Sequence, residues 1–199
     1  MQNQNWNLKV RNLEMFTPNP EFFRSWLKAF DSELPPKTIS FKVSSESLFM
    51  FEEPMVQTCR KIILQFPYDN NLKLDDWFFK LQNPQMELIY SNFPHESMEK
   101  ILNNWVDHPR PLGTSFSQGK VDFRDIVAVV DLVPTWFPQS VPSKLPNLTT
   151  DFQNCVTIPM DEKLEIVIFG EAEARENPNY PFSWYLRFEV MEKGTTVPR

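Results

Sequence analysis

Glycine is scarce in this chain of 199 residues: only four glycines occur, and they are scattered singly. Phosphate-binding loops and dinucleotide-binding turns need several glycines close together, so the sequence has no material for either. Basic residues are also outnumbered, with 20 Lys and Arg against 26 Asp and Glu and a formal net charge of −6. Because nucleic-acid binding depends largely on clustered cations, this balance predicts no nucleic-acid partner.

Cysteine and histidine are equally rare, with two of each. The polar N-terminus lacks the basic start and apolar run of an export signal, which predicts a cytoplasmic or nuclear protein without a membrane partner. Cys59 and Cys155 are therefore expected to be buried reduced thiols. Metal sites need clustered ligands, and neither these residues nor the acidic pairs have a metal-binding spacing. We predict no metal site and no cofactor.

Aromatic residues are abundant, with 18 Phe and six Trp, and they supply the volume of a compact core. In the first 133 residues, short runs of alternating apolar residues take turns with segments of helical period, which indicates consecutive β-α units. The expected strands cover residues 7–13, 38–43, 61–66, 86–91 and 112–117. The expected helices cover residues 22–30, 72–81, 94–107 and 122–130, and residues 44–60 fit neither pattern.

The strand starts at 38, 61, 86 and 112 follow one another at a spacing typical of leucine-rich-repeat-like proteins, whose repeats have about 20–29 residues. We therefore predict an α/β fold, a solenoid of β-α units with a mostly parallel curved sheet. An ordinary open α/β domain is the alternative.

The composition changes after residue 133, where prolines predict a loop that cannot be helical and is only doubtfully a strand. These prolines are Pro134, Pro138, Pro142, Pro146 and Pro159. Alternating runs at 163–169 and 182–190 then predict a β-pair that closes the sheet. In this interpretation residues 1–133 form the repeat region, and residues 134–199 pack on the same domain.

Short motifs carry a resemblance to a known family. Leu74-Asp75-Asp76 precedes a short apolar helix, Ser91-Asn92-Phe93 leads into a helix that contains Asn103-Asn104-Trp105, and Pro109-Arg110 follows. In this order the segments resemble the nematode F-box-associated domain (type 2), over roughly residues 19–117. Pro111, inserted before Leu112, departs from the family pattern.

That resemblance implies a function without catalysis. Such domains are the substrate-recognition parts of adaptors that bring targets to a Skp-cullin-F-box ubiquitin ligase. The F-box itself is a helical module ahead of the recognition domain, and the short stretch before the first expected helix leaves no place for it. The chain is then expected to be either a recognition fragment of a longer protein or a stand-alone relative. The Skp subunit would bind only a longer product that carries an F-box.

A row of strands backed by helices also favours protein recognition on physical grounds, since it presents alternate side chains on a rigid surface. If Ile39, Phe41, Ile62, Leu64 and Leu88 face the helices, the opposite face carries the candidate partner-binding residues. These are Ser40, Lys42, Ile63, Gln65, Glu87 and Ile89. Alternatively, this face is simply solvated or is covered by the C-terminal strands.

The alternative function is a small α/β hydrolase or transferase that uses His95 or His108 in a cleft at the strand ends. Asp107 could orient His108, but neighbouring residues at a helix end point in different directions. Cys59 follows no histidine at a recognisable spacing and is expected to be a core thiol. The sequence therefore predicts no catalytic residues, and we expect a recognition module rather than an enzyme.

Overall fold

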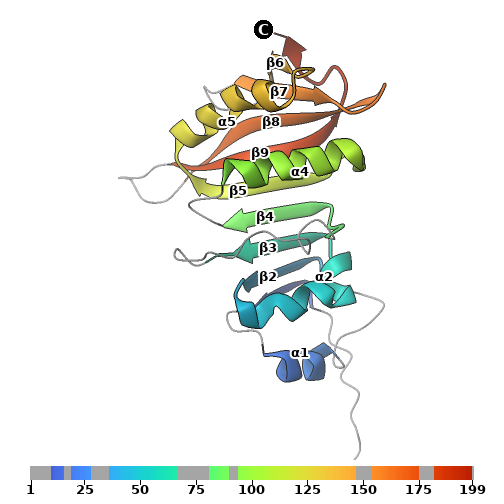
Figure 1. The fold of residues 1–199 in the computed structure, drawn as a ribbon. Helices are drawn as coiled ribbons and strands as arrows, with labels where there is room; N and C mark the ends of the chain where they lie inside the picture. Colours follow the sequence, from blue (N-terminus) through green and yellow to red (C-terminus); the bar gives the residue numbers. More distant parts are fainter. Residues whose placement is uncertain are drawn as a thin grey trace, which may run out of the picture. The chain divides into compact units, whose positions relative to one another are not determined.

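The computed structural model describes residues 10–15, 19–27, 36–66, 81–89, 94–146, 154–174 and 182–198. These residues form a mixed α/β structure with ten strands (Figure 1). The chain divides into two compact units, Met1–Glu87 and Leu88–Arg199. Strand β4 (Gln85–Ile89) spans the division.

The first unit contains three parallel strands and the segments that connect them. Its elements are β1 (Asn12–Met15), α1 (Pro20–Leu27), β2 (Thr38–Lys42), the 3-10 helix η1 (Ser45–Glu52), α2 (Pro54–Thr58) and β3 (Lys61–Gln65). The strands pair without a shift, so that Leu13 lies opposite Ile39 and Ile39 opposite Ile62. The expected strands at 38–43 and 61–66 are thus confirmed within one residue. Of the strand expected at 7–13, residues 7–9 lie outside the described residues, and β1 covers Asn12–Met15.

Local signals explain the helical segments of this unit. The side-chain oxygen of Asn19 accepts a hydrogen bond from the backbone N–H of Phe22 at 3.0 Å and caps α1, which starts with Pro20. The Ser44 N–H donates to Ser47 Oγ at 2.8 Å at the start of η1. Pro54 separates η1 from α2, so residues 44–60 form two short helices rather than one.

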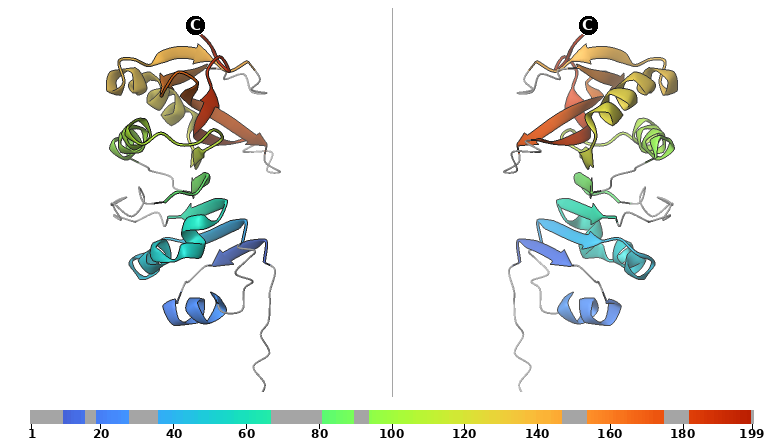
Figure 2. Two further views of the ribbon diagram at one scale, coloured as in Figure 1. Left: turned by 90° about the vertical axis from the view of Figure 1, so that its right-hand side faces the viewer. Right: turned by 90° about the vertical axis from the view of Figure 1, so that its left-hand side faces the viewer.

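Aromatic rings join these helices to the strands. The rings of Phe41 on β2 and Phe51 on η1 lie 5.4 Å apart between centroids. Phe23 on α1 meets Phe49 on η1 at 6.0 Å. The helical segments therefore cover the side of the strands that carries Phe41, and this side forms the core of the unit (Figure 2).

A buried side-chain amide links the segments that precede β3 and β4. The Asn83 side-chain amide donates to the backbone oxygens of Val56 and Cys59, both at 2.8 Å. The Cys59 thiol is itself buried and donates to the oxygens of Val56 and Lys61 at 3.3 Å. Burial raises the pKa of this thiol to about 11. Cys59 and Cys155 are both buried and form no disulfide with each other, which confirms the expected reduced thiols.

The second unit contains two long helices and an antiparallel sheet. Its strands follow the order β5-β9-β8-β7-β6-β10, and neighbouring strands in this order pair antiparallel. The elements are α4 (His95–Asp107), β5 (Ser115–Val121), α5 (Phe123–Trp136), β6 (Val141–Lys144), β7 (Asn154–Pro159), β8 (Leu164–Ala174), β9 (Phe182–Glu192) and β10 (Val197–Pro198).

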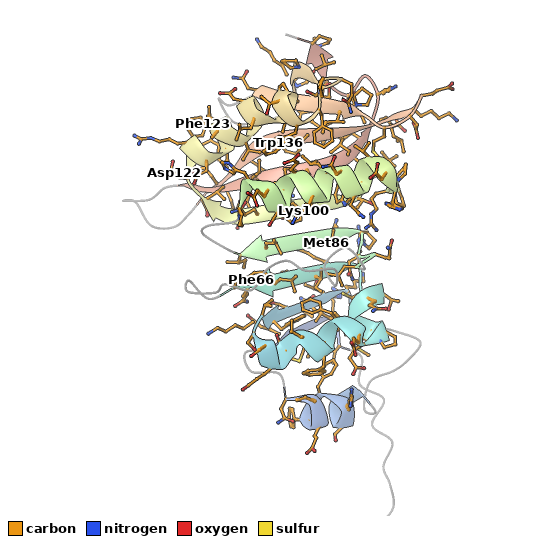
Figure 3. All side chains as sticks on the ribbon, in the orientation of Figure 1. Phe66, Met86, Lys100, Asp122, Phe123 and Trp136 are labelled. Atoms are coloured by element: carbon orange, nitrogen blue, oxygen red, sulfur yellow. The ribbon has the colours of Figure 1, made fainter. Side chains whose placement is uncertain are left out.

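Both helices of this unit lie on the same face of its sheet (Figure 2). Their apolar stripes are buried against alternate strand residues, as an amphipathic helix on a sheet requires. The buried residues of the two layers are Met98, Ile101, Leu102, Trp105, Ile126, Val129, Val130 and Val133 on the helices, and Phe116, Ile158, Ile166, Ile168, Phe188 and Val190 on the strands. Figure 3 shows Asp122 and Phe123 at the start of α5, where the Asp122 carboxylate accepts the Arg124 N–H at 2.8 Å.

The prediction of a mostly parallel solenoid is wrong. Parallel pairing is found between β1, β2 and β3, whereas the strands from β5 onward pair antiparallel. The regular spacing of strand starts indicates the order of elements but not their direction. Strand β5 pairs with β9, far along the chain, so that Ser115 lies opposite Glu189. The expected closing β-pair corresponds to β8 and β9, which lie inside an open sheet rather than closing one.

The prolines after residue 133 also behave differently from the prediction. Pro134 lies inside α5, Pro142 inside β6, and Pro159 ends β7. Pro134 has no N–H to donate to the carbonyl four residues earlier, but it falls in the last turn, so this loss affects only the end of the helix. The Phe137 N–H still donates to the Val133 oxygen at 2.8 Å. Strand β6 is short and pairs with only two residues of β10, a position near a sheet edge where proline is accepted.

The other predicted elements meet the structure in different ways. The expected helices at 94–107 and 122–130 are confirmed as α4 and α5. The expected strand at 112–117 begins three residues later, because a turn precedes it: the Thr114 N–H donates to the Pro111 oxygen at 3.1 Å, and Gly113 adopts a positive φ of 80°. The expected helix at 72–81 lies outside the described residues except for its last residue, the buried Leu81.

The Asn83 amide generates a stability prediction. Asn83→Ala leaves two buried backbone oxygens without this donor and should lower the free energy of unfolding by about 1–3 kcal/mol. Urea denaturation measures the change. Asn103→Ala, on the exposed side of α4, removes the same side chain from a solvated position and serves as the control. Equal stability of the Asn83 variant and wild type would contradict this role.

Candidate functional site

The strands of the first unit bury one set of alternate side chains and present the other. Ile39, Phe41, Ile62 and Leu64 have no exposed surface, as predicted for the set facing the helices. Leu88 on β4 is likewise fully buried. The neighbouring residues on the opposite side of β1, β2, β3 and the start of β4 form a surface that we call the first open face. It consists of Glu14, Ser40, Lys42, Lys61, Ile63, Gln65 and Glu87.

Hydrogen bonds hold the polar side chains of the first open face in fixed positions. The Gln65 amide donates to Ser40 Oγ at 3.1 Å and to Glu14 Oε1 at 3.4 Å, so a single side chain links three strands. Lys61 Nζ lies 2.6 Å from Glu87 Oε2. Lys42 is exposed and forms no ion pair with another residue that the structure describes. The face thus offers one available cation beside an ordered polar network.

All six predicted partner-binding residues lie on the expected side of their own strands. Lys42 is exposed, whereas four of the other residues are half-buried: Ile63, Gln65, Glu87 and Ile89. Ser40 is 7% exposed, because Gln65 lies against it. Ile89 belongs to the second unit and is therefore no part of the first open face.

Two residues of this face escaped the sequence prediction. Glu14 was missed because the first strand was expected at 7–13, which excludes it. Lys61 alternates with Ile63 and Gln65 along β3 and could have been found by extending that pattern by one step.

The second unit has a corresponding surface on the side of β8 and β9 away from its helices. We call it the second open face and define it by Glu171, Glu173, Tyr185, Arg187 and Glu189. Glu171 lies opposite Tyr185 across the two strands, and Glu189 lies two residues beyond Arg187 on β9. Arg187 forms an ion pair with Glu171. The Arg187 guanidinium also lies 6.0 Å from the centroid of the Tyr185 ring.

A glycine makes room for this ring. Gly119 on β5 lies opposite Tyr185, and a Cβ at this position would lie 2.7 Å from Tyr185 Cε1. The tyrosine ring therefore rests directly on the backbone of β5, where any side chain would displace it. The contact with Gly119 holds the Tyr185 ring in place, and the Arg187 guanidinium lies beside this ring.

Burial affects the acidic groups of the second unit. Burial raises the pKa of Glu189, and the charge of Glu171 acts in the same direction while Arg187 opposes both. Burial also raises the pKa of Glu165 on β8, although a hydrogen bond from Thr196 at 3.3 Å acts in the opposite direction.

Part of the same side of the sheet is apolar. There Leu145, Cys155, Val167 and Phe169 form a buried cluster with Met191 packed against it.

The structure does not bring the two histidines together. His95 is the first residue of α4 and His108 follows its last, so the 13-residue helix separates them by about 20 Å. Both are exposed. Among the described residues, no three potential metal ligands form a group, and none of the described helices is both long and apolar enough to cross a bilayer.

A comparison with known families identifies a match. A family model described as "Domain of unknown function (DUF3557)" matches residues 3–120, which is more than half of the chain. The chain belongs to this family. The DUF3557 match includes all three parallel strands and extends through α4 almost to the end of β5. No curated protein and no solved structure gives a significant match. The DUF3557 description assigns no function, so the resemblance to the F-box-associated domain stays a prediction.

The raised pKa of Glu189 predicts a pH-dependent stability. The ordinary pKa of a glutamate is 4.5, and the folded state retains the Glu189 proton to a higher pH than the unfolded state does. The protein therefore loses stability as the pH rises from 4.5 through the raised pKa of Glu189. Glu189→Gln keeps the neutral form. The stability advantage of this variant over wild type should therefore grow as the pH rises above 4.5 and then level off.

Urea denaturation over a pH series measures this difference. Glu162→Gln removes the same charge from an exposed turn and controls for net charge. A stability difference that is independent of pH, or that shrinks as the pH rises, would contradict the effect of burial on Glu189.

Proposed function

We propose that this DUF3557 chain is a non-enzymatic protein-recognition module and that the first open face is its contact surface. The observation that carries the proposal is the Gln65 side chain on β3, which is hydrogen-bonded to Ser40 on β2 and to Glu14 on β1. A surface whose side chains are already ordered loses little conformational entropy when a partner binds. The half-buried Ile63 supplies an apolar contact within this polar network, the combination that protein interfaces typically use.

The charge balance favours a protein partner over a nucleic acid. The first open face contains acidic and basic side chains side by side, with Lys61 already paired to Glu87. A phosphate backbone would require an uninterrupted basic surface. A protein segment can instead place a carboxylate at Lys42 and an apolar side chain on Ile63.

The resemblance noted in the sequence supports a more specific proposal. We propose that the recognition module is the substrate-binding part of an F-box-type ubiquitin-ligase adaptor, with a possible ubiquitination target as its partner. The Skp subunit would then be recruited only in a longer product that carries an F-box. The proposal of a ligase adaptor depends on the resemblance, whereas the proposal of a recognition surface depends on the side chains of β1, β2 and β3.

Affinity capture with matched variants tests the first open face. Lys42→Glu reverses the available charge and should reduce recovery of the partner from cell extract by about tenfold, since like charges across an interface oppose binding. Lys100→Glu makes the same reversal on the exposed side of α4 (Figure 3) and should retain the partner. Equal recovery by Lys42→Glu and wild type, measured by quantitative mass spectrometry, would refute the proposed surface.

A second experiment addresses the enzyme alternative. Alanine replacement of both His95 and His108 should leave stability and partner capture unchanged, because the two side chains are exposed at opposite ends of α4. Ester and phosphate substrates then provide a test of turnover. Hydrolysis by wild type that the double variant abolishes would establish a hydrolase and overturn the recognition proposal.

A further inference from the structure

The second open face has features that the proposed function does not use. On this side, the two long strands β8 and β9 contain the acidic side chains Glu171, Glu173 and Glu189 against a single arginine. Tyr185 and Gly119 belong to the same surface and pack against each other. Both described helices of the unit lie on the other side of the sheet (Figure 2).

The arrangement around Arg187 shows how this surface holds a guanidinium of its own chain. One guanidinium is held between the Glu171 carboxylate and the face of the Tyr185 ring. Carboxylate pairing combined with aromatic stacking is the ordinary way in which proteins recognise arginine. The protein therefore contains, within its own chain, an example of the contact that a cationic ligand would make here.

One carboxylate remains beyond this internal pair. Glu189 is half-buried, lies two residues from Arg187 on the same strand, and forms no ion pair with another described residue. Glu173 is exposed two residues beyond Glu171. After Arg187 has neutralised Glu171, the surface still carries an excess of negative charge along both strands.

We propose that the second open face docks a cationic segment of a partner protein through arginine or lysine side chains that pair with Glu189 and Glu173. Charge complementarity excludes an anionic occupant, since carboxylates or phosphates would be repelled by the excess of glutamates. This surface is independent of the first open face, so either proposal can fail alone.

A labelled peptide provides the test. The probe is a fluorescein-labelled decapeptide of alternating arginine and serine, and its binding to the full chain is followed by fluorescence anisotropy at about 50 mM salt, where screening is moderate. The double variant Glu173→Gln with Glu189→Gln should weaken binding about tenfold. Asp107→Asn with Asp131→Asn removes two exposed charges from α4 and α5 and should change the affinity less than about twofold.

A gain-of-function variant makes the test independent of folding defects. Arg187→Gln removes the internal guanidinium and releases Glu171 and Tyr185 for the peptide, so binding should tighten by about threefold or more. The Lys42→Glu variant of the first open face should leave peptide affinity unchanged within about twofold, which separates the two proposals.

Each of three peptide-binding results would overturn the inference. They are no binding of the peptide to wild type, equal weakening in the two double variants, and an unchanged affinity in Arg187→Gln. The second outcome would show that the overall net charge of the chain, and not the second open face, determines peptide affinity. Self-association of the wild-type chain that the Glu173 and Glu189 double variant abolishes would assign the face to a second copy and would also refute a cationic partner segment.

Discussion

The parallel pairing of β1, β2 and β3 without a shift is the constraint on which the first unit depends. Because Leu13, Ile39 and Ile62 lie opposite one another, the apolar side chains of the three strands reach the same core. A shift of one residue would expose the whole set and bury Lys61 and Glu14 in its place, at a large cost in desolvation. The same constraint therefore fixes which side chains face outward.

Much of the first unit could be predicted because its alternation is strong and local. Ile39 and Phe41, like Ile62 and Leu64, alternate with polar residues, and this pattern alone identified the buried side and the candidate contact residues. Helices α4 and α5 were predictable for a similar reason, since Met98, Ile101, Leu102 and Trp105 recur at helical spacing.

Strand direction could not be predicted from the same pattern, because direction is set by which distant segment supplies the partner. Strand β5 follows a helix just as β2 and β3 do, yet it pairs with β9, whose Phe188 packs against Phe116 at 5.2 Å between ring centroids. The second open face was missed for the same reason. Glu171 and Arg187 come together only through the antiparallel register of β8 and β9, which no local periodicity encodes.

The two buried cysteines have a practical consequence for exploring both faces. The Cys59 sulfur is enclosed and hydrogen-bonded, with its pKa near 11, and Cys155 is buried beneath Leu145 and Phe169. Thiolate is the reactive form, so the native chain presents almost no background to alkylating reagents at neutral pH. A single cysteine introduced at an exposed strand position would therefore carry a crosslinker or spectroscopic label without prior removal of the natural thiols.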